Sequence, residues 1–315
     1  MAIKVSVINF KGGVGKSTLT FHLAAHLAKE AKVLVVDVDH QSSLSIVMMG
    51  GDLWDKAAVA RTTCNTIFES FCNRKVAMPG DEIIHKNVLR SRDKRYNLYP
   101  TLDLVPAQFE LDDTEIEMAS TTMGSAMLSE WHKRTLMAEW LDAIDADNAY
   151  DYILFDCPPA TKLVSQNALA ASNYFVIPVI PDAMSSRGVT HFRSLVTNKI
   201  DKKLEFLRTG SSIADKDVPA AYCPTTKMAA IVPFMAKTAG NAASGLTNIH
   251  TEQLTALRRQ WKEDMIEPVV THMTGVAEAI DAGWPVWTAY ETPNIRKVIP
   301  MMRATCVAIA ERLTP

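Results

Sequence analysis

The amino-acid sequence predicts an α/β fold in which a doubly wound, mostly parallel sheet is flanked by helices. Three observations predict this class. A β-branched apolar run over residues 5–8 ends in a glycine-rich loop, which leads into an amphipathic stretch over 17–29. Two later apolar runs, over 33–38 and 152–155, each end at aspartates. Strands that are apolar on both faces belong in parallel sheets covered by helices, and ligands bind at the carboxyl edge of such sheets.

The first strand, loop and helix form a phosphate-binding unit, read as VSVINFKGGVGKST over residues 5–18. Glycines let backbone N–H groups approach phosphate oxygens, and the helix N-terminus adds a favourable dipole. A lysine and a hydroxyl residue follow in register, as phosphate and Mg²⁺ require. Phe10 stands where the common P-loop pattern has its first glycine. The predicted nucleotide contacts are Lys11, Gly12, Gly13, Val14, Gly15, Lys16, Ser17 and Thr18.

The form K-G-G-V-G-K-S, with a second lysine ahead of the glycines, resembles the deviant Walker A loop of the ParA/MinD superfamily of P-loop ATPases. The resemblance implies ATP and Mg²⁺ as cofactors. It also implies that Lys16 acts on the nucleotide of its own chain. Lys11 would then reach across the interface of an ATP-dependent homodimer to the nucleotide of the partner.

Composition places the chain among soluble globular proteins. Its 315 residues suffice for one large α/β domain, and 48% of them are apolar. No apolar run is long enough to cross a bilayer, and five cysteines without paired spacing fit a reducing cytoplasm. The formal net charge of −2 indicates that any DNA contact depends on local patches.

The helix over 17–29 carries His22 and His26 four residues apart, but Leu23 occupies the position of the glutamate in an H-E-x-x-H zinc site. The strand over 33–38 then brings Asp37 and Asp39 to the sheet edge that holds the P-loop. By resemblance, Asp39 positions the attacking water and Asp37 holds Mg²⁺ through water. The alternative is that both aspartates only initiate a turn. The family continues D-P-Q, whereas His40 replaces the proline here.

Residues 44–95 show weak patterning, and residues 50–98 form a weakly predicted helical and basic segment. A short amphipathic helix is expected within 62–76, followed by a break at Pro79 and Gly80. Residues 85–95 are basic and predict a solvated surface segment, with DNA or partner contact as the alternative.

The middle of the chain continues the alternation with a strand over 102–105, a helix after Pro106 and a long helix over 127–144. The strand over 152–155 runs into Asp156, which is the Walker B arrangement for orienting the water shell of Mg²⁺. Together with Ser17 and Asp37, Asp156 completes the predicted metal set.

A helix over about 161–172, a strand over 174–180, a helix over about 186–207 and a strand over 228–237 follow. By resemblance, Pro178 and Pro181 border the adenine. In several relatives an asparagine past the last strand touches the base, but Pro233 and Phe234 stand there, so the base-reading residue is unassigned.

The C-terminal part, about 248–315, is expected to be helical after a mobile loop at 239–248. Basic residues on its two main helices are candidates for non-specific contact with DNA phosphates, as in the resembling family. They are Arg258, Arg259, Lys262, Arg296, Lys297 and Arg303.

These expectations combine into one hypothesis for residues 1–315, read as a single ParA-like domain without a helix-turn-helix ahead of the P-loop. The chain is expected to be a slow, Mg²⁺-dependent ATPase that dimerises on ATP and binds DNA non-specifically. A ParB-like partner would stimulate hydrolysis as a plasmid, chromosome region or other cargo is positioned. The protein would be cytoplasmic, nucleoid-associated when ATP-bound, and would not bind membranes. The alternatives are a MinD-like membrane-associated ATPase and a biosynthetic enzyme resembling dethiobiotin synthetase.

Overall fold

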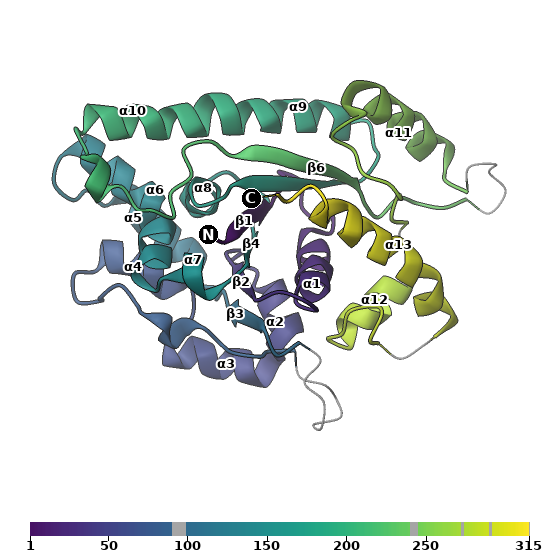
Figure 1. The fold of residues 1–315 in the computed structure, drawn as a ribbon, viewed down its shortest axis with the longest axis horizontal. Coiled ribbons are helices and arrows are strands. Elements are labelled where there is room, and N and C mark those ends of the chain that lie inside the picture. The colour runs from purple at the N-terminus through teal and green to yellow at the C-terminus, as the bar shows by residue number, and fades with distance from the viewer. Residues whose placement is uncertain (90–98, 240–244, 272–273, 290–291, 315) are drawn as a thin grey trace.

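A six-stranded, all-parallel sheet organises the computed structural model, which confirms the predicted fold class. The structure describes residues 1–315 except 90–98, 240–244, 272–273, 290–291 and 315. The strands lie in the order β3-β2-β4-β1-β5-β6 (Figure 1). Their bounds are β1 Ile3–Val7, β2 Val33–Asp37, β3 Leu102–Val105, β4 Tyr152–Asp156, β5 Tyr174–Val179 and β6 Lys227–Pro233.

The register of the central strands brings the predicted site residues to one edge. Asp156 at the end of β4 is paired with Asp37 at the end of β2 and with Val7 at the end of β1. The connection after β1 leads to β2, which lies beyond β4 in the sheet. The connection after β4 leads in the opposite direction, past β1, to β5. This reversal of strand order is where open α/β sheets bind ligands.

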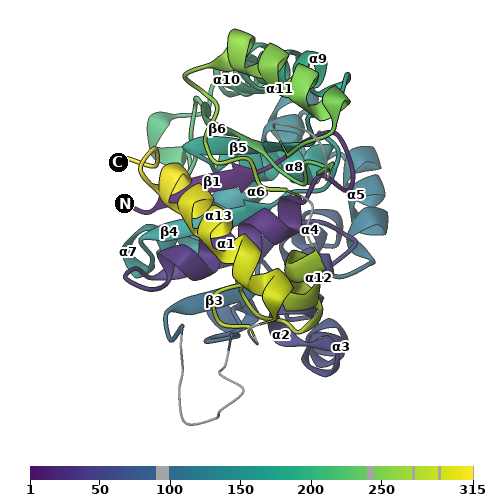
Figure 2. The same cartoon turned by 90° about the vertical axis from the view of Figure 1, so that its right-hand side faces the viewer.

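Helices cover both faces of the sheet. On one face, α1, α2, α3, α12 and α13 contribute to a shared apolar core, and Figure 2 shows α13 lying across α1. On the other face, α4, α5, α6, α8, α9, α10 and α11 contribute to a second core. The helix bounds are α1 Lys16–Leu27, α2 Ser43–Met49, α3 Gly51–Ala60, α4 Asn65–Cys72, α5 Leu111–Ser120, α6 Ala126–Ala143, α7 Ala146–Ala149, α8 Leu163–Ala170, α9 Ser185–Leu195, α10 Lys202–Gly210, α11 Asn248–Trp261, α12 Thr274–Asp281 and α13 Pro293–Ala310.

Two regions differ from the sequence expectations. The weakly patterned stretch from residue 44 includes most of α2 and all of α3, which are separated by Gly50 at φ +82°. In α3 only Trp54 and Ala57 are buried, whereas Leu53 and Val59 are exposed. The helix expected over 186–207 is divided into α9 and α10 by a π-helical segment, Val196–Asp201. A π turn shifts the phase of the buried positions, which a search for constant helical spacing does not detect.

Two expected surface segments fall partly outside the described residues. Of the expected segment at 85–95, residues 85–89 lie beside the edge strand β3, where His85 forms a backbone bridge with Leu104. This portion therefore extends the edge of the sheet. The basic residues 90–95 lie outside the described part of the chain. Of the expected mobile loop at 239–248, residues 240–244 also lie outside the described part of the chain. Thr238 and Leu246, on either side, form a bridge.

His22 fastens the P-loop helix to the C-terminal part of the chain. Its ring is fully buried, with Nδ1 2.7 Å from the Thr18 carbonyl oxygen, while Nε2 accepts from the Val286 backbone N–H at 3.2 Å. Because Nε2 accepts, the proton is on Nδ1 and donates to Thr18. Burial lowers the pKa of His22 to about 4, so the ring is neutral near pH 7. His22 therefore has a packing role, and no group of three His, Cys, Asp or Glu residues positioned for a metal ion is found in the described part of the chain.

We expect His22 to make folding sensitive to acid. The pKa of the folded state lies below the unfolded value, so the unfolded chain takes up the proton first as the pH falls. Stability is complete above about pH 6.5 and is lost down to about pH 4. Urea unfolding of wild type and His22→Gln should give free-energy differences that shrink by about 2 kcal/mol between pH 7.5 and 5. A pH-independent difference would contradict this assignment.

Candidate nucleotide-binding site

The P-loop turns sharply between β1 and α1. Gly13 and Gly15 have φ angles of +69° and +85°, a region that residues with a side chain rarely adopt. A Cβ atom on Gly15 would also lie 2.5 Å from the ring of Phe234, which follows β6. The loop thus depends on glycine here for conformation and for space, and it lies directly against the end of β6.

Lys16 is the first residue of α1 and is only 6% exposed. Its ammonium group donates to the Lys11 carbonyl oxygen at 3.3 Å, so the side chain folds back along the loop. Burial lowers the pKa of Lys16, and the carboxylates of Asp156 and Asp39 oppose this effect. The structure therefore places one buried cation between the phosphate loop and two carboxylates that come from different strand ends.

Asp156 has a carboxylate oxygen available for a ligand. Its Oδ1 accepts from the Thr20 hydroxyl at 3.0 Å, whereas Oδ2 is buried and has no hydrogen-bond partner. Burial raises the pKa of Asp156, and the nearby Asp37 carboxylate adds to the increase. This buried oxygen without a partner, on a carboxyl group whose pKa a hydrogen bond with the Ser17 side chain acts to lower, fits a hard cation such as Mg²⁺. This ion commonly takes one or two carboxylates from the protein and completes its shell with water and phosphate.

Asp37 is also buried at this edge, but both of its oxygens already accept hydrogen bonds. Oδ2 accepts from the backbone N–H and hydroxyl of Ser45 at 2.9 and 2.6 Å, and Oδ1 accepts from the Asp39 N–H at 3.1 Å. Ser45 in turn accepts from the Ala107 N–H at 2.9 Å. Burial raises the pKa of Asp37 to about 7, although these hydrogen bonds act to lower it. Asp37 therefore joins β2, the first turns of α2 and the segment after β3.

Asp39 lies in the loop between β2 and α2, and it is 8% exposed. Its Oδ1 accepts from the Gln41 backbone N–H at 3.0 Å and lies 3.9 Å from Nδ1 of His40. The local turn fixes the carboxylate, and its charge acts on Lys16. Asp39 is thus close to the P-loop although it contacts no P-loop side chain by a described hydrogen bond.

Lys11, unlike Lys16, points outward. Its ammonium group pairs with Asp182 beyond β5, and its side chain remains 47% exposed. Its backbone N–H donates to Asn9, whose side-chain amide donates to the Pro178 carbonyl oxygen at 2.7 Å. Pro178 and Pro181 are both buried. The two P-loop lysines therefore face different surroundings.

A separate apolar cavity of about 240 Å³ lies beside the first turn of α1. The sequence pattern does not reveal this cavity, because its walls come from three distant parts of the chain. The sequence gives one indication of it, since Pro233 and Phe234 stand where several relatives have an asparagine that touches the base. Neither Pro178 nor Pro181 lines it; its lining residues are Thr18, Phe234, Met235, Val270, Thr271, Val276, Ala277 and Ile280.

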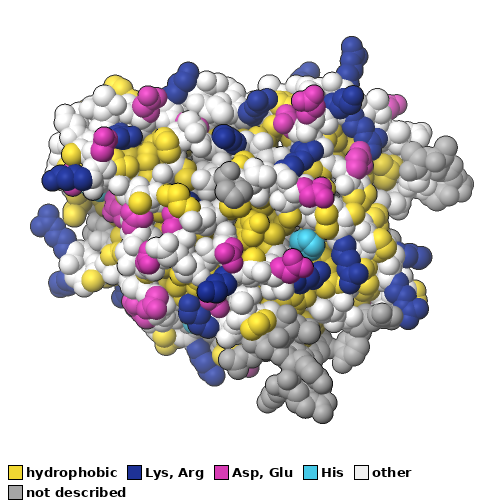
Figure 3. All heavy atoms as spheres, viewed as in Figure 1, with side chains coloured by type: hydrophobic (Ala, Val, Ile, Leu, Met, Phe, Trp, Pro, Cys, Tyr) yellow, Lys and Arg dark blue, Asp and Glu magenta, His cyan; other side chains and the backbone are white. Residues whose placement is uncertain are grey.

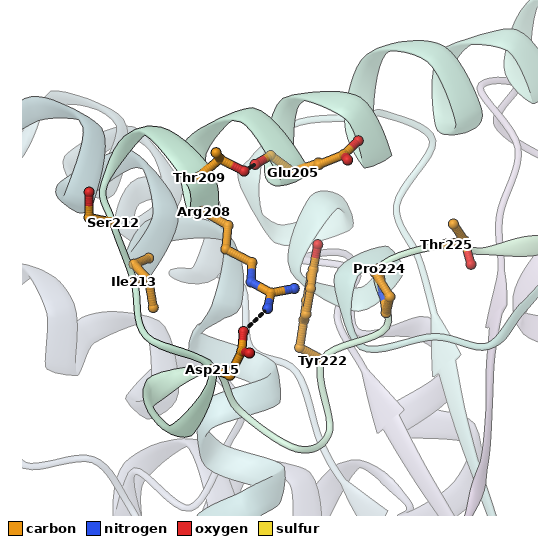
Figure 4. Close-up of a pocket in the computed structure, with 9 residues that line it drawn as sticks. All are labelled: Glu205, Arg208, Thr209, Ser212, Ile213, Asp215, Tyr222, Pro224 and Thr225. Carbon is orange, nitrogen blue, oxygen red and sulfur yellow. Dashed lines mark hydrogen bonds and ion pairs between the residues drawn. The ribbon is translucent and has the colours of Figure 1, made fainter.

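A larger hollow of about 560 Å³ under α10 is unrelated to this chemistry. Figure 4 shows Arg208 descending from α10, bonded to Asp215 and close to the ring of Tyr222. None of its lining residues belongs to the P-loop or to the strand-end carboxylates. We therefore assign the site by its chemistry and not by the size of the hollow.

The six candidate DNA residues are all exposed, but they differ in their partners. The guanidinium of Arg258 pairs with Glu267, with Nε 2.8 Å from Oε1. Lys and Arg side chains are scattered over the face in Figure 3, and several gather at the upper right, where Figure 1 places α11. No helix in the described part of the chain is long and apolar enough to cross a membrane.

Sequence comparisons relate the chain to partition proteins. A family described as AAA domain matches residues 2–208. Chromosome partitioning protein ParA of Myxococcus xanthus is 28% identical over 283 residues, covering 90% of this chain and 80% of ParA. Sporulation initiation inhibitor protein Soj of Bacillus subtilis is 31% identical over 193 residues, covering 61% of this chain and 64% of Soj.

Solved structures share the fold at low identity. Apo McdA of Cyanothece superposes with a TM-score of 0.67 at 16% identity, covering all of both chains. A putative plasmid partition protein of Borrelia burgdorferi bound to AMPPNP gives 0.61 at 17% identity, covering 99% of this chain and 98% of that one. Cobyrinic acid a,c-diamide synthase of Mycobacterium smegmatis with ADP and magnesium gives 0.57 at 18% identity, covering 92% and 97%.

Proposed function

The chain belongs to this AAA-domain family as a ParA-type P-loop partition ATPase, and from that membership we propose that it is an ATP-driven dimerisation switch that binds DNA non-specifically. A ParB-like partner would stimulate hydrolysis and so release the DNA. The observation that carries the proposal is the meeting of Lys16, Asp39, Asp37 and Asp156 at one sheet edge beside the glycine loop. A loop that merely turned between strand and helix would have no need of a buried lysine facing strand-end carboxylates.

Each residue of this cluster has a distinct task in the proposed reaction. Lys16 stabilises negative charge that develops on the transferred phosphoryl group, an effect strengthened by burial. Asp39 orients the attacking water and accepts its hydrogen bond. Ser17, Asp156 and, through water, Asp37 would hold Mg²⁺, which when bound neutralises charge on the β- and γ-phosphate oxygens. Backbone N–H groups at residues 12–16 fix the phosphates in place.

Lys11 supports a role for a second copy of the chain. It is half-exposed and pairs with Asp182 instead of turning into its own phosphate loop. An exposed ion pair contributes little to stability, so its loss on dimer formation costs less than about 1 kcal/mol. Lys11 is thereby free to reach a phosphate on the partner chain.

The proposed DNA binding rests on the exposed basic residues of α11 and α13. The dependence of DNA affinity on salt concentration tests it. We expect binding to random-sequence duplex DNA with ATP and not with ADP. Arg259→Ala and Lys262→Ala should each reduce the slope of log K against log salt by about 1. Arg258→Ala is the matched control with a smaller effect, because Glu267 already neutralises that side chain.

Failure of this experiment has clear consequences. If neither ATP nor ADP supports DNA binding at any salt concentration, the partition proposal is wrong. Vesicle binding with ATP would then support the membrane-associated alternative. A stoichiometric small-molecule product formed with ATP consumption would support the biosynthetic one.

A further inference from the structure

We propose that a groove formed by α2, α3 and the turn after α12 docks an amphipathic helix of a partner protein, one whose polar side is acidic. The groove has a volume of about 750 Å³, which is within the range of ligand sites. Its walls also include residues 85–88, beside the edge strand β3. The described walls share no residue with the nucleotide site, so the groove is a separate feature of the molecule.

The lining of the groove is largely apolar and can adapt to a partner. Met48 and Met49 on α2, Ala57 on α3 and Trp284 after α12 are nearly buried, whereas Leu53 on α3 is 54% exposed. Methionine side chains fill irregular spaces and are common on surfaces that bind peptides. Apolar side chains spaced three and four residues apart on a partner helix can therefore pack here, with Leu53 as an accessible contact.

Two lysines give this apolar groove a positive charge. Lys56 on α3 is exposed and takes part in no ion pair within the described part of the chain. Lys86 is 55% exposed, and its pairing with Asp103 at 3.2 Å is a surface contact that contributes little and can be exchanged. The sequence that follows this wall, at 90–95, holds four Arg or Lys residues and one Asp. Carboxylates beside the apolar contacts of the partner complement this charge.

The sheet edge beside the groove is already paired, which favours a helix over an added strand. His85 and Leu104 exchange backbone hydrogen bonds of 2.7 and 2.9 Å, and the Asn87 N–H donates to Asp103 at 3.0 Å. An extended segment would find these backbone groups in use. A helix satisfies its own backbone groups and needs only side-chain contacts with the groove.

Hydrogen bonds to elements of the nucleotide site hold the walls in place. Asp37 accepts from the backbone N–H and the hydroxyl of Ser45 in the first turn of α2. Val286, just after the turn that lines the groove, is bonded through its N–H to α1. Between these two points, a Cβ on Gly283 would lie only 3.1 Å from the Val47 carbonyl oxygen. A groove with fixed walls loses little conformational freedom on binding, which favours docking.

A partner in the groove leaves the proposed DNA-binding helix free. Figures 1 and 2 place α3 and α11 at opposite ends of the molecule. The chain can therefore hold a partner on α3 while the basic residues of α11 contact DNA. This joint arrangement rests on the proposed function, whereas the docking itself does not.

Peptide binding to the full chain, without nucleotide, tests the proposal. The probe is a fluorescein-labelled helical peptide of about 15 residues, with leucines three and four residues apart and glutamates elsewhere. A companion peptide carries lysines in place of the glutamates. Fluorescence anisotropy should give a dissociation constant of about 100 μM or tighter for the glutamate peptide, and one at least about tenfold weaker for the lysine peptide. Equal binding of the two peptides, or no binding of the glutamate peptide, would overturn the proposal.

Two surface variants locate the bound peptide. Lys56→Glu should weaken the glutamate peptide at least about tenfold and strengthen the lysine peptide, a reversal that misfolding cannot produce. Leu53→Asp should weaken the glutamate peptide at least about tenfold, because a charge replaces an apolar contact. Lys202→Glu, at an exposed position on α10, changes the net charge equally and should leave both affinities unchanged. An unchanged affinity for the glutamate peptide in Lys56→Glu would place the peptide elsewhere.

An anionic lipid is the competing occupant, since it also joins an apolar chain to a negative charge. Co-sedimentation with phosphatidylglycerol vesicles separates the two. Vesicle binding that is lost in both Leu53→Asp and Lys56→Glu, without binding of the glutamate peptide, would assign the groove to lipid and overturn the proposal. These measurements contain no nucleotide, so their failure leaves the proposed ATPase function intact.

Discussion

Lys16→Ala lowers the rate of ATP hydrolysis by roughly 10²- to 10³-fold, the effect expected when one preorganised donor to transition-state charge is removed. Lys16 is nearly buried at the start of α1, and the charges of Asp156 and Asp39 favour its protonated form. Without it, two buried carboxylates face the phosphates with no cation from this chain between them. Repulsion between these carboxylates and the phosphates should therefore weaken ATP binding as well.

Phosphate release at saturating ATP measures the Lys16 effect. Lys162→Ala is the matched control, since Lys162 is 56% exposed and pairs with Asp112 outside the P-loop. That variant should keep the wild-type rate within about twofold, because exposed pairs contribute little. A Lys16→Ala rate within tenfold of wild type would remove Lys16 from the proposed mechanism.

Asp39→Asn separates hydrolysis from nucleotide binding. Asparagine has nearly the shape of aspartate, and its side-chain oxygen can still accept from the Gln41 N–H, so the loop after β2 should be preserved. What is lost is the negative charge that orients water. We expect hydrolysis to fall about 10²- to 10⁴-fold, with the dissociation constant for ATP changed by less than about tenfold.

Single-turnover hydrolysis and ATP binding, measured side by side, test the Asp39 prediction. His40→Ala is the control, because His40 lies 3.9 Å from Asp39 yet has no proposed part in the reaction. If Asp39→Asn hydrolyses ATP at the wild-type rate, the aspartate only shapes the turn, which is the alternative that the sequence left open.

The fold and the phosphate site were predictable because their signals are local. The glycine loop is contiguous with β1 and α1, and Asp37 and Asp156 each end an apolar run. Parallel strands place their carboxyl ends at one edge, so separate motifs could be combined without knowledge of tertiary contacts. The same logic gives the position of Asp39.

Other parts of the site depend on contacts between distant residues, which the sequence pattern does not contain. The wall formed by Phe234 and Thr271 meets Thr18 only in the folded chain. The pairing of Lys11 with Asp182 likewise joins two separate loops. The hydrogen bond from the Val286 backbone N–H to Nε2 of His22, which gives this histidine its packing role, also joins residues far apart in the sequence.

Particle mass as a function of nucleotide tests the central claim most directly. Sedimentation of Asp39→Asn, which should retain ATP, would report whether ATP joins two chains. We predict twice the monomer mass of 34.8 kDa with Mg²⁺ and ATP, and the monomer mass with ADP. Lys11→Ala in the same background should remain monomeric, because its lysine no longer reaches the partner's phosphates. A mass that is the same with ATP and ADP would contradict the switch.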